Sequence, residues 1–174
     1  MFALTDKAHR MCAALTVIVT LAVAAGCSWG KDDVGMQPTE TRKEAAEHVE
    51  RLLKDAIAQL PGRVQTEVGL RVDTLPCDDP TDGGPLGRVI VEHDYDIHGL
   101  ADKDYPEQFE ILKRYWEDRG YRRLLFEKDG KSLLMKYTDS AEYRIVLGTS
   151  FDGSSLWVRA SSPCIWPNGT PEPE

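Results

Sequence analysis

Residues 122–137, RRLLFEKDGKSLLMKY, decide the fold class of this chain. Two short runs rich in apolar residues flank Asp129-Gly130, a dipeptide typical of a two-residue turn between antiparallel strands. Residues 142–150 alternate apolar and polar side chains, and another short run follows at residues 156–161. This part of the chain therefore predicts a series of antiparallel strands joined by short turns.

Two helices are predicted earlier in the chain. The first begins after Thr41, which stands at capping-box spacing from Glu44, and its apolar residues recur at helical intervals as far as residue 60. The second begins near Pro106, a residue suited to a first helical turn, and ends at Gly120. Each helix has a single apolar stripe, so each can cover one face of a sheet.

Two more strands are predicted between these helices, at residues 63–75 and 88–97. The first alternates strictly, which is typical of a half-buried strand. Its expected inward side chains are Val64, Thr66, Val68, Leu70 and Val72. The order α-β-β-α-β-β-β-β predicts an α+β fold, a two-layer sandwich in which a mainly antiparallel sheet of about five to six strands carries two helices on one face. The domain is expected to span residues 41–166, followed by a flexible tail at 167–174.

The N-terminus has the pattern of an export signal. Lys7 and Arg10 precede an uncharged stretch, residues 11–25. As a helix this stretch would cover roughly 22 Å, less than the ~30 Å hydrocarbon core of a bilayer, so a cleaved signal is a better interpretation than a permanent span. The stretch ends in AAGC, residues 24–27, where small residues precede a cysteine.

The segment LAVAAGC resembles the lipobox of bacterial lipoproteins. The resemblance implies that diacylglycerol is attached to the Cys27 thiol, that residues 1–26 are removed as a signal peptide, and that residues 27–40 form a tether. Such anchoring would make the lipid bilayer a partner and place the domain on the extracytoplasmic face of the cell membrane. The alternatives are an ordinary cleaved signal with a chance cysteine, or an uncleaved anchor.

A wider resemblance rests on this lipobox together with the segments RVIVEHDY, YWEDRGYR and SSPCIWP. In this arrangement the chain resembles lipoproteins of actinobacteria whose function is unassigned. The resemblance implies an anchored domain on the outer face of the cytoplasmic membrane, and it implies no site residues.

The charge of the chain excludes one class of partner. There are 21 lysines and arginines against 29 aspartates and glutamates, a formal net charge of −8. An acidic surface repels nucleic acids and other polyanions, so no nucleic-acid partner is expected.

The four cysteines divide between three fates. Cys12 would leave with the signal and Cys27 would carry lipid. Cys77 and Cys164 then remain in an oxidising compartment, where a disulfide between them is expected. A redox pair or a metal site is the alternative, but there is no CxxC spacing and neither cysteine has a histidine near it in the sequence.

Acidic residues and a histidine share one face of the strand at 88–97 and its end. They are Glu92, Asp94, Asp96 and His98. Neighbours on one strand face lie ~6.8 Å apart, so two of these side chains could share a divalent cation but four could not converge on it. A solvated outer face is the simpler interpretation, and no metal or other cofactor is expected. His93 points to the opposite, core side, where a hydrogen-bonded structural role is expected.

Three aspartates near glycines, within residues 78–84, bear a loose likeness to a calcium loop but lack its spacing. The chain contains no GxSxG, SxxK, HExxH or glycine-rich phosphate motif, so no enzymatic activity is predicted. Trp157 and Trp166 could mark a binding patch, with packing under the tail as the alternative.

The function predicted from these features is a binding or interaction domain in the cell envelope, whose partner is an envelope protein or a small ligand. Two alternatives remain. One is an accessory hydrolase or metal-dependent enzyme that uses the strand face from Glu92 to His98. The other is a passive structural surface protein.

Overall fold

A computed structural model of the chain describes residues 37–77 and 85–171. Cys27, the predicted signal and the loop at 78–84 lie outside these residues. The elements, in order, are α1 (Arg42–Ile57), β1 (Gln65–Pro76), β2 (Val89–His98), the 3-10 turn η1 (Asp102–Asp104), α2 (Tyr105–Asp118), β3 (Arg122–Asp129), β4 (Ser132–Thr138), β5 (Arg144–Thr149) and β6 (Leu156–Ser161). Among the described residues, no helix has the length and apolar character needed to cross a membrane.

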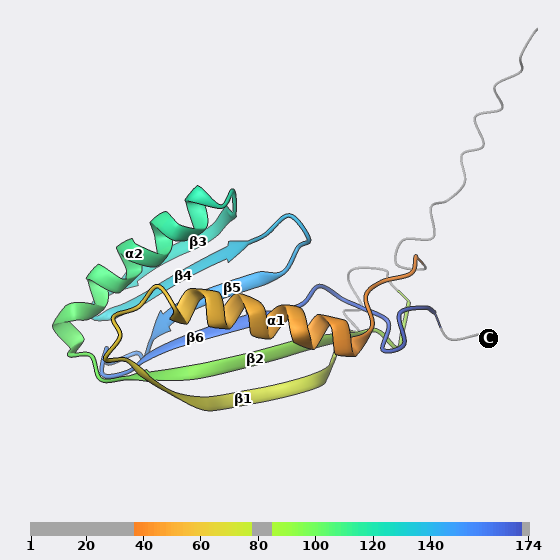
Figure 1. Cartoon of the computed structure of the whole chain (residues 1–174), viewed down its shortest axis with the longest axis horizontal. Helices are drawn as coiled ribbons and strands as arrows, with labels where there is room; N and C mark the ends of the chain where they lie inside the picture. The colour runs from red at the N-terminus through yellow and green to blue at the C-terminus, as the bar shows by residue number, and fades with distance from the viewer. Residues whose placement is uncertain (1–36, 78–84, 172–174) are drawn as a thin grey trace, which may run out of the picture. The chain divides into compact units, whose positions relative to one another are not determined.

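The six strands form one sheet in the order β1-β2-β6-β5-β4-β3, and every neighbouring pair is antiparallel. Strands β3 to β6 form a meander, and β6 then pairs with β2, so that the β1–β2 hairpin joins the sheet at its other side (Figure 1). This arrangement confirms the predicted α+β sandwich. It leaves β1 and β3 as the two edge strands.

Both helices pack on the same face of this sheet. Strand register places Ile145 opposite Ala160 and Tyr137 opposite Ile145, so these residues share one face. They belong to a single core cluster with the buried residues of α1 and α2. The helix residues of this cluster are Ala45, Val49, Leu52, Leu53, Ala56, Tyr105, Phe109, Leu112 and Trp116. The other face of the sheet has no helix over it among the described elements (Figure 1).

The start of α1 has the predicted capping box. The Thr41 side chain accepts a hydrogen bond from the Glu44 backbone N–H, and the Glu44 carboxylate accepts one from the Thr41 N–H at 2.8 Å. These contacts satisfy backbone donors that a helix N-terminus otherwise leaves without partners. They also hold the pKa of Glu44 below its usual value.

The prediction that β1 has one buried apolar face is wrong. Most of β1 is exposed, and its pairing with β2 has irregularities after Val68 and again after Val72. Val68 lies opposite Tyr95 on the helix side, whereas Val72 lies opposite Glu92 on the outer face. The first bulge therefore reverses the alternation and brings Arg71, rather than an apolar residue, to the helix side beside Glu50 at 3.3 Å.

The hairpin between β3 and β4 forms one residue later than predicted. The pair Asp129 and Ser132 closes it, so the two loop residues are Gly130 and Lys131. Gly130 has a φ of 57°. A positive φ at the first of two loop residues is typical of a type II′ turn and favours glycine there.

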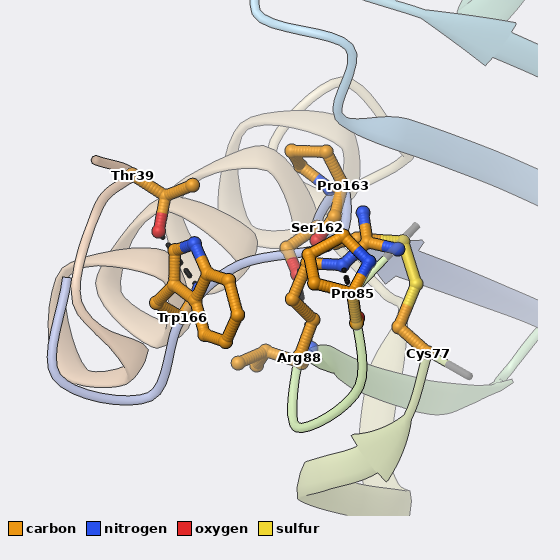
Figure 2. The surroundings of a disulfide bond; sticks show 9 residues. Thr39, Cys77, Pro85, Arg88, Ser162, Pro163 and Trp166 are labelled. Atoms are coloured by element: carbon orange, nitrogen blue, oxygen red, sulfur yellow. Dashed lines mark hydrogen bonds between the residues drawn. A yellow bond between two sulfur atoms is a disulfide. The ribbon is translucent and has the colours of Figure 1, made fainter. Parts of the chain in front are cut away.

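A disulfide joins Cys77 to Cys164, as predicted, with 5.8 Å between the Cα atoms. Cys77 follows β1 and Cys164 follows β6, so the bridge links two strands that are separated in the sheet by β2 (Figures 1 and 2). Next to it, Arg88 donates from Nε to the Pro85 carbonyl at 3.1 Å (Figure 2). The bridge therefore fastens edge strand β1 to the C-terminal end of the fold.

The domain extends beyond the predicted bounds of 41–166 at both ends. Thr39 donates its backbone N–H to the Gly169 carbonyl at 2.9 Å, and its hydroxyl accepts from the Trp166 N–H at 2.8 Å. The N–H of Arg42 binds the Pro167 carbonyl. The last part of the predicted tether and the first part of the predicted tail thus hydrogen-bond to each other, which is why residues 39–40 and 167–169 belong to the domain.

Candidate functional site

A cleft of about 560 Å³ lies between α2, the β3–β4 hairpin and the turn before β6. This volume falls in the range of small-ligand sites. Its apolar lining comes from Tyr105, Pro106 and Phe109 of α2, Phe126 of β3 and Leu133 of β4. We call it the α2–β3 cleft.

Local sequence explains why the cleft forms where it does. Pro106 stands in the first turn of α2, and Phe109 follows on the buried stripe of that helix. On the opposite side, the turn before β6 comes against the hairpin loop at Gly153. A Cβ at Gly153 would lie 2.8 Å from the Lys131 Cβ, and Gly153 has a φ of +73°. Glycine therefore allows the two turns to meet at the end of the cleft.

Three lysines and two carboxylates are the charged side chains that line the cleft. Lys103, Lys128 and Lys131 line it together with Asp102 and Glu110. Glu110 already has a cation beside it, because its carboxylate lies 3.4 Å from the Lys113 ammonium group. The positive charge is local, since the chain as a whole is acidic.

This arrangement is suited to binding. The rings of Phe109 and Phe126 offer apolar surface, and the lysines offer charge to an anionic group. Phe126 keeps 47% of its surface exposed, so the apolar lining is accessible. The cleft is thus able to hold a molecule with an apolar part and a negatively charged part.

The residues proposed for a metal lie on the outer face of the sheet and do not converge. Glu92 is 3.4 Å from Arg159, and His98 is 3.6 Å from Glu67 of the neighbouring strand. Within residues 37–77 and 85–171, no group of three or more His, Cys, Asp or Glu side chains is arranged to hold a metal ion. Glu92 and His98 thus pair with side chains of neighbouring strands.

Asp94 differs from the solvated residue that the sequence suggests, because it is buried. Its Oδ2 accepts two hydrogen bonds from Arg159, at 3.0 Å from Nε and 2.6 Å from Nη2. Its Oδ1 accepts the backbone N–H of Leu70, which lies in the first bulge of β1. Asp94 therefore holds the bulge of the edge strand against the centre of the sheet.

The two tryptophans do not form the single patch that the sequence suggested. Trp157 lies on the outer face, opposite Gly148, with the Arg159 guanidinium 5.4 Å from its ring centre. Trp166 is only 3% exposed and packs near Gly87. The Trp166 backbone N–H donates to the Thr39 hydroxyl at 2.8 Å, which fixes this residue beside the segment before α1.

His93 is the hydrogen-bonded core histidine that the sequence predicts. It is 1% exposed, and its Nδ1 lies 2.8 Å from Glu50 of α1 while its Nε2 lies 2.7 Å from Asp73 of β1. Tyr95 also donates to Glu50, at 3.0 Å. The imidazole thus joins α1 to both strands of the first hairpin.

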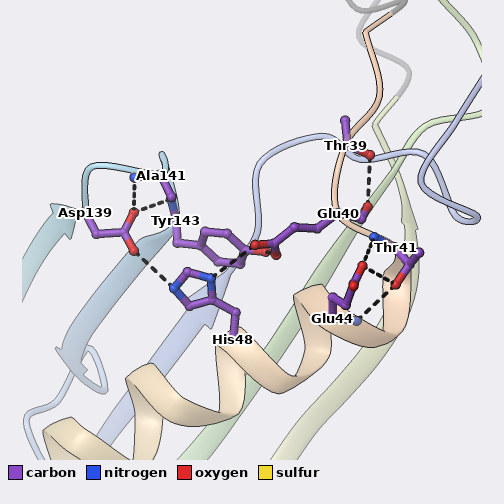
Figure 3. A network of polar contacts seen from close by, with 8 residues as sticks. All are labelled: Thr39, Glu40, Thr41, Glu44, His48, Asp139, Ala141 and Tyr143. Carbon is purple, nitrogen blue, oxygen red and sulfur yellow. Dashed lines mark hydrogen bonds and ion pairs between the residues drawn. The ribbon is translucent and has the colours of Figure 1, made fainter.

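A second histidine, His48 of α1, lies in another polar cluster (Figure 3). Its ring stacks on Tyr143 with 3.9 Å between ring centres, and its Nε2 lies 3.4 Å from Asp139. Tyr143 donates from its hydroxyl to Glu40. Burial, and then this hydrogen bond, raise the pKa of Tyr143 above its usual value. The cluster fastens Glu40, two residues before α1, to the turn between β4 and β5.

Alkaline pH should weaken the fold through its buried tyrosines. Burial, and then the hydrogen bond to Glu117, raise the pKa of Tyr137 from 10.0 to about 12. The folded state therefore favours the neutral phenol, so this stabilisation is complete below pH 10 and is lost as pH rises towards 12. Since one pKa unit corresponds to about 1.4 kcal/mol, Tyr137 alone should account for a loss on the order of 2 kcal/mol.

Urea unfolding at about pH 9 and about pH 12 measures this loss for the natural chain and for Tyr137→Phe. The variant should lose less stability between the two pH values, because phenylalanine does not ionise. An equal loss in both proteins would show that Tyr137 does not contribute to the alkaline sensitivity.

The sequence interpretation missed the α2–β3 cleft. Its lining comes from η1 and α2, from the β3–β4 hairpin and from the turn before β6, and no motif marks these separate segments. One signal was present in the sequence, because Phe126 is an aromatic residue followed directly by the charged residues 127–129.

Comparison with known proteins gives no match to this chain among family models, curated proteins or solved structures.

Proposed function

We propose that the chain is a lipoprotein held at the extracytoplasmic face of the cell membrane through acylated Cys27, and that its domain binds another component of the cell envelope. The segment AAGC at residues 24–27 supports the anchor. The Cys77–Cys164 disulfide supports an oxidising, extracytoplasmic compartment. Two acyl chains would give stable attachment, since each buried CH₂ contributes about 0.8 kcal/mol.

The observation that carries the binding function is the α2–β3 cleft. Two phenylalanines line it and lysines surround it, so it fits a ligand that joins an apolar group to an anionic one. This cleft favours a binding domain over a passive surface protein. The Glu92–His98 face gives less support to an enzyme, because Arg159 lies beside both Glu92 and Asp94.

Labelling cells with palmitate tests the anchor. The full chain should carry the label and sediment with membranes, whereas Cys27→Ala should lose both properties because no thiol remains to accept the lipid. Cys12→Ala is the matched control, since Cys12 lies within the predicted signal, and it should be labelled like the natural chain. Labelling of the Cys27→Ala variant would contradict the proposal.

Fluorine NMR tests the cleft. Of the four phenylalanines in the chain, Phe2 lies in the predicted signal, so 4-fluorophenylalanine reports mainly on Phe109, Phe126 and Phe151. Phe109 and Phe126 line the cleft, whereas Phe151, in the turn before β6, is 86% exposed and is not among the lining residues. The probe is N-acetylphenylalanine, which combines an aromatic ring with a carboxylate, added to the full chain from the membrane fraction in nanodiscs.

The resonances of Phe109 and Phe126 should shift with the probe concentration, and that of Phe151 should shift less. The uncharged amide of the same probe should bind more weakly, because it loses its attraction to the lysines. Absence of any shift at Phe109 and Phe126 up to the solubility limit of the probe would overturn the binding function.

A further inference from the structure

Strand β3 lines the α2–β3 cleft through Phe126 and Lys128, and it is also an edge strand. Within the described sheet it pairs with β4 alone. The pairing is regular from Leu125 to Asp129, the part of the strand that borders the cleft. Strand β3 has one irregularity, between Arg123 and Leu125, which lies outside this part, whereas the other edge strand, β1, has two irregularities along its length. Bulges of that kind discourage pairing with another strand, so β3 is the edge that remains suited to it.

The hydrogen-bonding groups of β3 face the open edge at the cleft. In an antiparallel ladder, pairs that exchange backbone hydrogen bonds alternate with pairs that do not. The alternation starts with the hydrogen-bonded pair that closes a two-residue turn, here Asp129 and Ser132. Phe126 and Lys128 therefore direct their N–H and C=O groups away from β4, and the side chains of the same two residues line the cleft.

The charges at this edge are available to a ligand. Among the described residues, no carboxylate lies within 4.0 Å of the ammonium groups of Lys103, Lys128 or Lys131. By contrast, Glu110, the acidic residue of α2 at the cleft, is paired with Lys113. An acidic ligand would therefore find cations that no internal salt bridge already engages.

We propose that the ligand of the cleft is an extended, acidic peptide segment of a partner protein, which adds a strand to β3 beside α2. The peptide backbone pairs with Phe126 and Lys128. One of its apolar side chains enters the cleft between Phe109 and Phe126, and its carboxylates lie near the lysines. A groove between a helix and an edge strand suits this mode, in which backbone hydrogen bonds give affinity and the pocket selects alternate side chains. This inference rests on the proposed binding function of the same cleft.

The test is selection from a random dodecapeptide library on the full chain in nanodiscs, after depletion on empty nanodiscs. Enriched peptides should combine an apolar residue with acidic residues at neighbouring positions. Their Kd should rise at least tenfold with Phe126→Ala and with Lys128→Glu. The matched control is Lys136→Glu, on the outer face of the sheet, which should change the Kd less than twofold.

Methylation of the peptide backbone separates strand addition from other binding modes. N-methyl groups on one set of alternate amides should weaken binding at least tenfold, and those on the other set should have little effect. Equal effects from both sets would overturn strand addition.

Both ligands are tested on the same full chain in nanodiscs, so a failure of this inference can be distinguished from a failure of the proposed binding function. If no peptide is enriched but N-acetylphenylalanine still shifts the resonances of Phe109 and Phe126, the cleft binds a small ligand and the peptide inference is wrong. If neither ligand binds, both proposals fail.

Discussion

Replacing Cys77 and Cys164 together by serine should lower the free energy of unfolding by about 4 kcal/mol. The bridge spans a sequence separation of 87 residues, and in the chain-entropy account a loop of this length restricts the unfolded state by roughly 4–5 kcal/mol. The folded state also depends on it locally, since β1 buries little surface of its own. Loss of the bridge should therefore release this edge strand first.

Thermal and urea unfolding of the oxidised chain, the reduced chain and the double serine variant measure the effect. Reduction should lower the Tm of the natural chain to near that of the variant, and it should leave the variant unchanged. Hydrogen exchange should show the largest loss of protection in β1. If the double serine variant had the same Tm as the oxidised natural chain, the stabilising role of the bridge would be contradicted.

Gly69→Ala should destabilise the domain by about 2 kcal/mol, and most of that cost should vanish when Asp94 is also replaced by alanine. A Cβ at residue 69 would overlap Oδ1 of Asp94, the atom that accepts the Leu70 N–H. The methyl group must therefore displace a buried carboxylate from its hydrogen bonds.

Asp94→Ala alone should cost about 3 kcal/mol. It leaves the Leu70 N–H in the bulge without its acceptor and removes the main partner of Arg159. The cost stays near the lower end of the range for a broken buried ion pair, because the Arg159 side chain is 38% exposed and Glu92 remains 3.4 Å away.

A double-mutant cycle by urea unfolding measures the coupling. The double variant should cost about 3 kcal/mol, clearly less than the sum of the two single costs. Gly62→Ala is the matched control. A Cβ there would meet nothing within 4 Å, so its effect should stay within about 0.5 kcal/mol. If the costs of Gly69→Ala and Asp94→Ala in unfolding free energy simply added, the position of the Asp94 carboxylate would not depend on a glycine at residue 69.

Sequence patterns predicted the elements whose signals are local. The capping box at Thr41 and Glu44 and the apolar stripes of both helices depend on spacing along one segment, and the structure confirms them. The Cys77–Cys164 pairing followed from elimination among four cysteines. Short turns also led to the prediction of about five to six mainly antiparallel strands, but not to their order in the sheet, in which β6 pairs with β2.

Local sequence patterns could not predict the features that depend on neighbouring strands. The apolar alternation of β1 continues through Leu70 and Val72, yet the bulge fixed by Asp94 turns these residues to the other face. Burial of Asp94 likewise depends on Arg159, which is 65 residues away in the chain. The α2–β3 cleft depends on how α2, the β3–β4 hairpin and the turn before β6 pack together, and no single stretch of sequence encodes that packing.

We propose that Cys27 anchors this domain to a membrane. The most direct measurement is the intact mass, with fragmentation of the N-terminal peptide, of the protein extracted from the membrane fraction without reduction. We predict a chain that begins at Cys27, carries diacylglycerol on that thiol, and has Cys77 and Cys164 joined. A chain that begins elsewhere, or one in which Cys27 bears no lipid, would contradict the account.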